Sequence, residues 1–296
     1  MPIRWPSGGM CCVSIYSIKP NRFLERIVFN DIPAPPRSAC CAGFELQVWR
    51  CKPFVNHLVE WLPDYALAES ELVVSHGNIY VKLQQAAVRV YTSEKYKNRG
   101  EAGEITLHAI CRDYFDTIPI APRVFYKNAS NDVVKSFDMV HARFPSDGTL
   151  ELWLGESKLY AESFDAISDA IASVKAHIQQ GFLTNEKLLL GPQISKTTPH
   201  YDEIVHLFKS QTSLDHLLNS SVFAIGIMSN SDALSSATAL TDAYRASISL
   251  EMNKLASKID KSGLLNTIKI ALIYVPLLDK DTFVDEFDKK LKGLQP

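Results

Sequence analysis

The chain has 296 residues, of which 46% are apolar and 22% are charged. This composition is sufficient for one large or two modest globular domains, and it excludes intrinsic disorder for most of the chain. Thirty-one basic residues against 33 acidic ones give a formal net charge of −2. A protein that grips nucleic acid by itself usually has a basic surplus, because neutralising phosphates supplies much of the affinity. We therefore expect that this chain binds no nucleic acid, uses local basic residues, or receives its substrate from a partner.

No apolar run reaches the roughly 18 residues that a membrane-spanning helix needs. The closest candidate, 264–278, is interrupted by Asn266, Thr267 and Lys269. The segment 11–18 is too short and too polar for a secretory signal, and no cleavage pattern follows it. These features predict a cytoplasmic protein.

The first 43 residues differ in composition from the rest. They contain a proline-rich run at 32–36 and the cysteine doublets Cys11-Cys12 and Cys40-Cys41. The doublets fit neither a secreted disulfide framework nor a zinc knuckle, which favours reduced thiols. We expect a loosely ordered N-terminal extension over residues 1–43, with 23–29 as its only firm element, followed by one globular domain over residues 44–296.

From residue 44 onward the apolar pattern changes repeatedly between strand-like and helix-like periods. Strands that alternate with helices predict an α/β domain, with a mixed central sheet flanked by helices. In chain order we expect a strand at 44–51, helices at 54–65 and 101–114, strands at 133–144 and 150–160, a helix at 164–178, a strand at 222–228, a helix at 239–258, a strand at 267–275 and a helix at 282–291.

The strands expected at 133–144 and 150–160 are separated by a short turn segment, which predicts a hairpin. A three-residue loop at 146–148, with Gly148 in the left-handed conformation, pairs residues whose numbers add to 294 and places Asp138 opposite Glu156. A two-residue loop would instead pair Asp138 with Gly155 and put the two acids on opposite faces. The register therefore decides whether the carboxylates meet.

Opposed carboxylates repel each other on a sheet, so such a pair indicates a bound divalent cation. Carboxylate oxygens suit Mg²⁺, which usually takes one or two of them and completes its coordination with water and phosphate oxygens. Lys158 shares a face with Glu156, because side chains alternate along a strand, and it could orient a water or stabilise negative charge. An acid-x-Lys pattern is weak by itself, since it recurs at 288–290 on an amphipathic helix.

The helix expected at 101–114 begins with acidic residues. Glu101, Glu104 and His108 share one face of it, and Glu104 is a candidate for a further metal or water ligand. The simpler interpretation is that these carboxylates stabilise the positive end of the helix dipole.

A basic stretch just before this helix is a candidate DNA-facing surface, because cationic and aromatic side chains together can track a strand. An ordinary solvated surface is the alternative. Arg143, beyond the hairpin aspartate, is a weaker candidate. The stretch consists of Arg89, Lys95, Lys97 and Arg99, with Tyr91 and Tyr96 between them.

Other catalytic patterns are missing from the sequence. There is no nucleophile elbow around Ser157, no metalloprotease or deaminase histidine motif, and no phosphate-binding G-x-x-x-x-G-K-[ST] loop. Any ATP-driven motor of that type must therefore be another chain.

Three segments resemble the core motifs of the PD-(D/E)xK nuclease superfamily. They are 98–104 (Asn-Arg-Gly-Glu-Ala-Gly-Glu), 137–138 (Phe-Asp) and 153–158 (Trp-Leu-Gly-Glu-Ser-Lys). More narrowly, residues 44 to the C-terminus are similar to the DUF1837 family, which includes HamA, the nuclease subunit of the Hachiman anti-phage defence system. Phe137 replaces the proline that usually precedes the motif aspartate.

The resemblance implies a restriction-endonuclease-like core and assigns roles to individual residues. It implies that Asp138 and Glu156 bind Mg²⁺ (or Mn²⁺), helped by the backbone carbonyl of Ser157, that Lys158 is catalytic, and that Glu104 is the acid of the first core helix. It also implies an ATP-dependent helicase partner that keeps the nuclease silent until it meets aberrant or invading DNA.

We therefore expect a Mg²⁺-dependent deoxyribonuclease that acts as an effector of anti-phage defence. Two alternatives stay open. The first is an interaction subunit that keeps the fold but mainly binds and regulates a helicase, and the second is a nuclease that acts on RNA. Either nuclease should bind nucleic acid weakly by itself, because the chain has no basic surplus.

Overall fold

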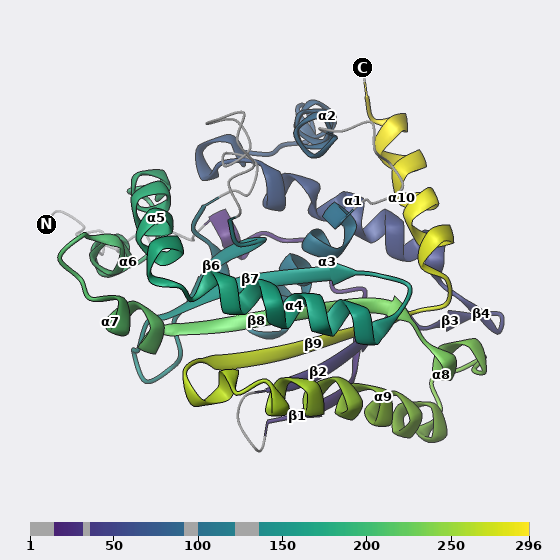
Figure 1. Ribbon diagram of the computed structural model, residues 1–296. Helices are drawn as coiled ribbons and strands as arrows, with labels where there is room; N and C mark the ends of the chain where they lie inside the picture. The colour runs from purple at the N-terminus through teal and green to yellow at the C-terminus, as the bar shows by residue number, and fades with distance from the viewer. Residues whose placement is uncertain (1–14, 32–35, 92–99, 122–135, 296) are drawn as a thin grey trace, which may run out of the picture.

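The computed structural model describes residues 15–31, 36–91, 100–121 and 136–295, and they are organised around a twisted central sheet (Figure 1). The sheet has seven strands in the order β1-β2-β9-β8-β7-β6-β5. Its four middle strands, β2, β9, β8 and β7, run parallel, and β1, β6 and β5 are antiparallel to their neighbours. The mixed sheet confirms the predicted fold class. The strands are β1 Glu25–Asn30, β2 Arg37–Cys41, β5 Ile118–Pro119, β6 Met139–Arg143, β7 Glu151–Leu159, β8 Ser221–Asn230 and β9 Lys269–Leu277.

Helices cover both faces of the sheet (Figure 1). On one face α4 packs on β7 and β8 and lies beside α9, which covers β1, β2 and β9. On the other face α3 packs on β7 and β8, and α1 packs on α3 with α2 and α10 further out. The helices are α1 Cys51–Ala66, α2 Ile79–Val90, α3 Gly100–Tyr114, α4 Ser163–His177, α5 Gln180–Leu190, α6 Tyr201–Phe208, α7 Leu214–Asn219, α8 Asp232–Ser235, α9 Asp242–Lys261 and α10 Lys280–Gly293. In the described part of the chain, no helix is both long and apolar enough to cross a membrane.

Strong periodicity predicted the long elements well. The helices expected at 101–114 and 164–178 are α3 and α4, each within one residue at either end. The strand expected at 44–51 is instead a tight two-stranded pair, β3 Phe44–Glu45 with β4 Val48–Trp49, followed directly by α1. Leu46 and Gln47 between them have φ of 47° and 67°, which turns the chain where an extended strand would continue.

The N-terminal segment that we expected to be a peripheral extension supplies two strands of the main sheet. β2 pairs in parallel with β9, and β1 pairs antiparallel with β2. Ala39, Cys40 and Cys41 are fully buried, and burial raises the pKa of the Cys40 thiol to about 12. The doublet is therefore part of the core, where cysteine behaves as a small apolar residue. We expected the globular domain to begin at residue 44, but two strands of its sheet lie before that residue.

The predicted hairpin register is confirmed. Met139 pairs with Gly155 and Arg143 with Glu151, so that paired residue numbers add to 294. Gly148 has a φ of 77°, and its N–H donates to the carbonyl of Pro145 at 3.0 Å, as a three-residue loop requires. The strand that contains Glu156 is thereby aligned with the segment that contains Asp138.

Gly155 on β7 lies close to both β6 and α3. A Cβ atom at this position would lie 2.7 Å from Cβ of Met139 and 3.0 Å from Cδ2 of Leu107. We predict that Gly155→Ala lowers the free energy of unfolding by about 1–3 kcal/mol, because the core would be overpacked. Gly181→Ala is the matched control, since a methyl group at that position would have no atom within 4 Å. Urea denaturation checks this, and equal midpoints for the two variants would contradict it.

Deleting residues 1–43 should abolish folding, because it removes β1 and β2 and exposes the edge of β9. Deleting only residues 1–14 leaves all these strands in place and should preserve the cooperative thermal transition. Circular dichroism on heating compares the two truncations. A cooperative transition of wild-type midpoint in the longer deletion would show that the two strands are dispensable.

Candidate active site

Strand β7 presents its side chains alternately to the two helical layers. Gly155 and Ser157 face α3, because a Cβ on Gly155 would meet Leu107 and the Ser157 hydroxyl would meet a Cβ on Gly103. Glu156 therefore faces the other layer, where its Oε2 lies 3.5 Å from Nδ1 of His177 in α4. Lys158 shares the face of Glu156, as the sequence predicted.

Glu156 and Lys158 form an ion pair within this face. Lys158 Nζ lies 2.9 Å from Oε1 of Glu156, and the carboxylate is nearly excluded from solvent. Burial by itself lowers the pKa of Lys158, but the carboxylates of Glu156 and Asp138 outweigh it and raise the pKa above its ordinary value. Lys158 therefore remains a cation at neutral pH, held beside a buried acid.

Asp138 lies immediately before β6, at the edge of β7. Its backbone N–H donates to the carbonyl of Gly155 at 2.9 Å, and its Oδ2 accepts the backbone N–H of Ser157 at 2.8 Å. The carboxylate is therefore fixed one residue from Glu156 along the edge of β7. The hairpin brings together Asp138, Glu156 and Lys158, which were chosen from the sequence.

Glu104 comes from a helix rather than from the hairpin. It lies on α3, where it accepts a hydrogen bond from the phenol of Tyr65 in α1. Its neighbour Gly103 is pressed against Ser157, so α3 covers the sheet face opposite to Glu156. In the described residues, no group of three or more histidine, cysteine or acidic side chains is arranged to hold a metal. A role for Glu104 at the metal stays a prediction.

The acid pair nevertheless fits a hard divalent cation. Asp138 supplies a carboxylate that accepts the N–H of Ser157, the residue next to Glu156, and Glu156 supplies the second carboxylate. Mg²⁺ typically binds through only one or two carboxylates and keeps several water ligands, so no third acid is required. Asp138 and Glu156 would hold the ion, and the carbonyl of Ser157, which lies next to Glu156 in the chain, stays a predicted further ligand.

The two candidates for DNA contact that lie among the described residues, Arg89 and Arg143, are each paired with an acid. Lys95, Lys97 and Arg99 lie outside the described residues. Arg143 pairs with Glu151 at 3.2 Å near the hairpin loop. It is five residues from Asp138, which corresponds to roughly 16 Å along a strand. Arg89 is held by Glu71 through two hydrogen bonds of 2.6 Å.

Sequence reasoning missed the side chains from α4 and α5 that surround the acids. The His177 ring stacks on Phe182 and meets the edge of Phe137, the residue before Asp138. The sequence did contain a signal that His177 is buried, because it lies three residues after Val174 and seven after Ala170, both on the buried face of α4. It therefore occupies the last buried position of an otherwise apolar stripe.

A buried polar chain links α3 to α1 and to β6. His108 Nε2 lies 2.8 Å from Asp64, His108 Nδ1 lies 3.0 Å from His141 Nε2, and His141 Nδ1 lies 2.8 Å from the Thr117 hydroxyl. With both histidines neutral, every ring nitrogen has one consistent role: Thr117 donates to His141, His141 to His108, and His108 to Asp64. Arg112 also donates to Asp64 at 3.1 Å. The chain thus fixes the helix of Glu104 and the strand after Asp138.

Burial lowers the pKa of both His108 and His141, the latter strongly. A histidine whose folded pKa is depressed stabilises the fold fully above the unfolded pKa of about 6.5 and loses that stability as the pH falls below it. We predict that the free energy of unfolding decreases below pH 6.5, by up to about 1.4 kcal/mol per pH unit for each histidine.

Urea titrations at several pH values measure this dependence. His141→Asn should reduce the slope, whereas His200→Asn, at a largely exposed histidine, should leave it unchanged. A wild-type stability that is flat between pH 7 and 5 would contradict the neutral chain.

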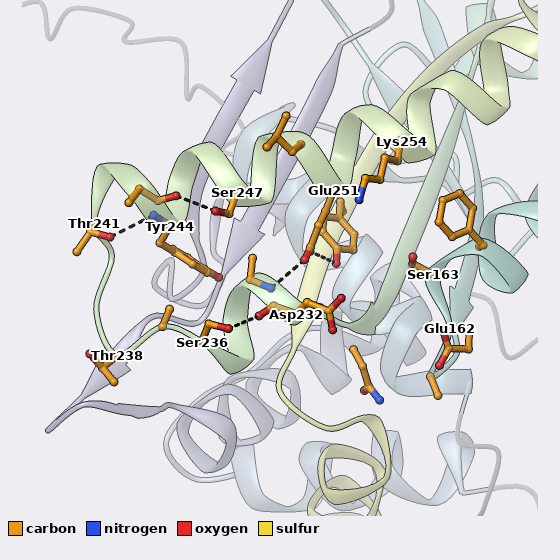
Figure 2. Close-up of a pocket in the computed structure, with 18 of the residues that line it drawn as sticks. Glu162, Ser163, Asp232, Ser236, Thr238, Thr241, Tyr244, Ser247, Glu251 and Lys254 are labelled. Carbon is orange, nitrogen blue, oxygen red and sulfur yellow. Dashed lines mark hydrogen bonds between the residues drawn. The ribbon is translucent and has the colours of Figure 1, made fainter.

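A separate polar cleft of about 790 Å³ opens beyond the ends of β7, β8 and β9, between the first turns of α4 and α9 (Figure 2). Its central carboxylate, Glu251, accepts hydrogen bonds from the hydroxyls of Ser231 and Tyr274 and from the N–H of Ala233, at 2.7–2.9 Å. Glu251 thereby holds the segment around α8 in place. Neither Asp138 nor the Glu156–Lys158 pair lines this cleft.

Comparison with known proteins identifies the family. The model of the HamA family matches residues 21–291, which includes both N-terminal strands and both acids of the hairpin. The matched region begins well before residue 44, where the sequence resemblance was expected to start. No curated protein and no solved structure matches the chain. The chain belongs to the HamA family and is a component of the Hachiman anti-phage defence system.

Proposed function

We propose that this protein is the nuclease of its defence system, a Mg²⁺-dependent enzyme that hydrolyses DNA phosphodiester bonds. One observation carries the proposal: the hairpin places the Asp138 carboxylate on the backbone N–H of Ser157 at 2.8 Å, next to Glu156, whose own carboxylate lies 2.9 Å from Lys158. Two acids and a lysine in this arrangement supply a metal site and a fixed cation beside it.

In this proposal Asp138 and Glu156 bind Mg²⁺, which when bound would polarise the scissile phosphate and lower the pKa of an attacking water. Asp138 is held by the backbone N–H of Ser157, so its carboxylate has little freedom to turn away. Lys158 contributes its positive charge to the phosphate oxygens or orients the water.

The charge distribution supports a partner that delivers the substrate. The net charge is −2, and the described candidates Arg89 and Arg143 are already paired with acids. Such a chain should bind DNA weakly, with a shallow dependence on salt. We propose that an ATP-dependent helicase supplies the strand and restrains the nuclease until DNA is engaged.

Plasmid cleavage with Mg²⁺, by the protein alone and together with its partner, tests the activity. Glu156→Gln and Lys158→Ala should each reduce cleavage by about 100-fold or more, and chelation should abolish it. The matched controls Glu286→Gln and Lys289→Ala alter an exposed pair of the same residue types on α10 and should cleave normally.

Cleavage that is unchanged in Glu156→Gln and Lys158→Ala would contradict this assignment. Preferred degradation of a matched RNA would make the protein a ribonuclease. If the protein binds and restrains the helicase but cleaves neither substrate, the interaction-subunit alternative holds.

A further inference from the structure

The Glu156 carboxylate is contacted on both of its oxygens. Oε1 lies 2.9 Å from Nζ of Lys158, and Oε2 lies 3.5 Å from Nδ1 of His177, the last residue of α4. Both His177 and Glu156 are 5% exposed, so water competes little for this contact. Nζ of Lys158 is within hydrogen-bond distance of Oε1, whereas Nδ1 of His177 lies next to Oε2 without forming a hydrogen bond to it in this structure. The acid is therefore enclosed between its own strand and the helix that covers it.

The His177 ring is itself held on two sides. It stacks on Phe182 of α5 with ring centroids 4.3 Å apart, and it meets the edge of Phe137 at 4.9 Å. Phe137 also packs against Phe223 of β8 and is almost fully buried. Phe137 directly precedes Asp138, and His177 lies next to Glu156. The same aromatic cluster therefore contacts both the segment of Asp138 and the histidine beside Glu156.

The contact between Glu156 and His177 matters because Lys158 cannot contact Glu156 and a substrate phosphate at the same time. If its ammonium moves toward a substrate phosphate, Oε1 of Glu156 loses its partner. A glutamate side chain has three rotatable bonds, so a single remaining anchor decides whether the carboxylate stays in place. Side chains that hold metal-ligating carboxylates are typically worth about 10–100-fold in metal affinity or activity.

We propose that His177 is a positioning residue that holds Oε2 of Glu156 in the metal-binding orientation when Lys158 turns to the substrate. Phe137 and Phe182 fix the ring in that position. This inference rests on the proposed function, because it assigns a role within the same site.

Substitution at His177 tests this role, and Mn²⁺ binding measured by electron paramagnetic resonance gives a readout that does not depend on cleavage. His177→Ala should weaken Mn²⁺ binding by about 10–100-fold and raise the Mg²⁺ concentration for half-maximal cleavage, with the KM for DNA unchanged. His177→Asn places an amide nitrogen close to the position of Nδ1 and should restore most of the affinity. His216→Ala, at an exposed helical histidine, is the control.

Wild-type Mn²⁺ affinity in His177→Ala, or an equal loss in folded His177→Asn, would overturn the positioning role while leaving the proposed function intact. If His177→Ala does not fold, the asparagine variant decides. Mn²⁺ binding by the wild type without any cleavage would overturn the nuclease proposal alone. No Mn²⁺ binding at all would overturn both.

Discussion

The antiparallel register of β6 and β7 is the constraint on which the candidate site depends. Side chains alternate along a strand, so a slip of one residue would send Asp138 and Glu156 to opposite faces. Gly148 prevents that slip, because its left-handed backbone closes a three-residue loop that pairs Met139 with Gly155. A loop about ten residues from the carboxylates thus sets the register that brings the segment of Asp138 beside the strand of Glu156.

The surrounding layers hold this hairpin from both sides. On one face the neutral chain through His108 and His141 ties β6 to α3 and α1. On the other face α4 and α5 bring His177 and Phe182 against Glu156 and the segment before Asp138. The two supports differ in chemistry. The first is a chain of hydrogen-bonded polar side chains, and the second is a cluster of aromatic rings in which the imidazole of His177 is the polar member.

The prediction succeeded for elements whose structure depends mainly on residues close together in the sequence. Helical periodicity located α3 and α4, and turn chemistry at Gly148 decided the register that aligns the acids. The prediction failed at β2, because a short strand of Ser, Ala and Cys has no alternation and becomes a strand only by pairing with β9, more than 200 residues away. His177 was missed for the same reason, since its contact with Glu156 arises only when α4 packs on β7.

The proposed nuclease function requires that Asp138 and Glu156 together hold a divalent ion. Anomalous scattering from a crystal of the protein grown with Mn²⁺ tests it most directly. We expect a peak between Asp138 and Glu156, with the metal about 2.1 Å from an oxygen of each carboxylate. A peak elsewhere, or an acid pair bridged only by Lys158 at saturating Mn²⁺, would contradict it.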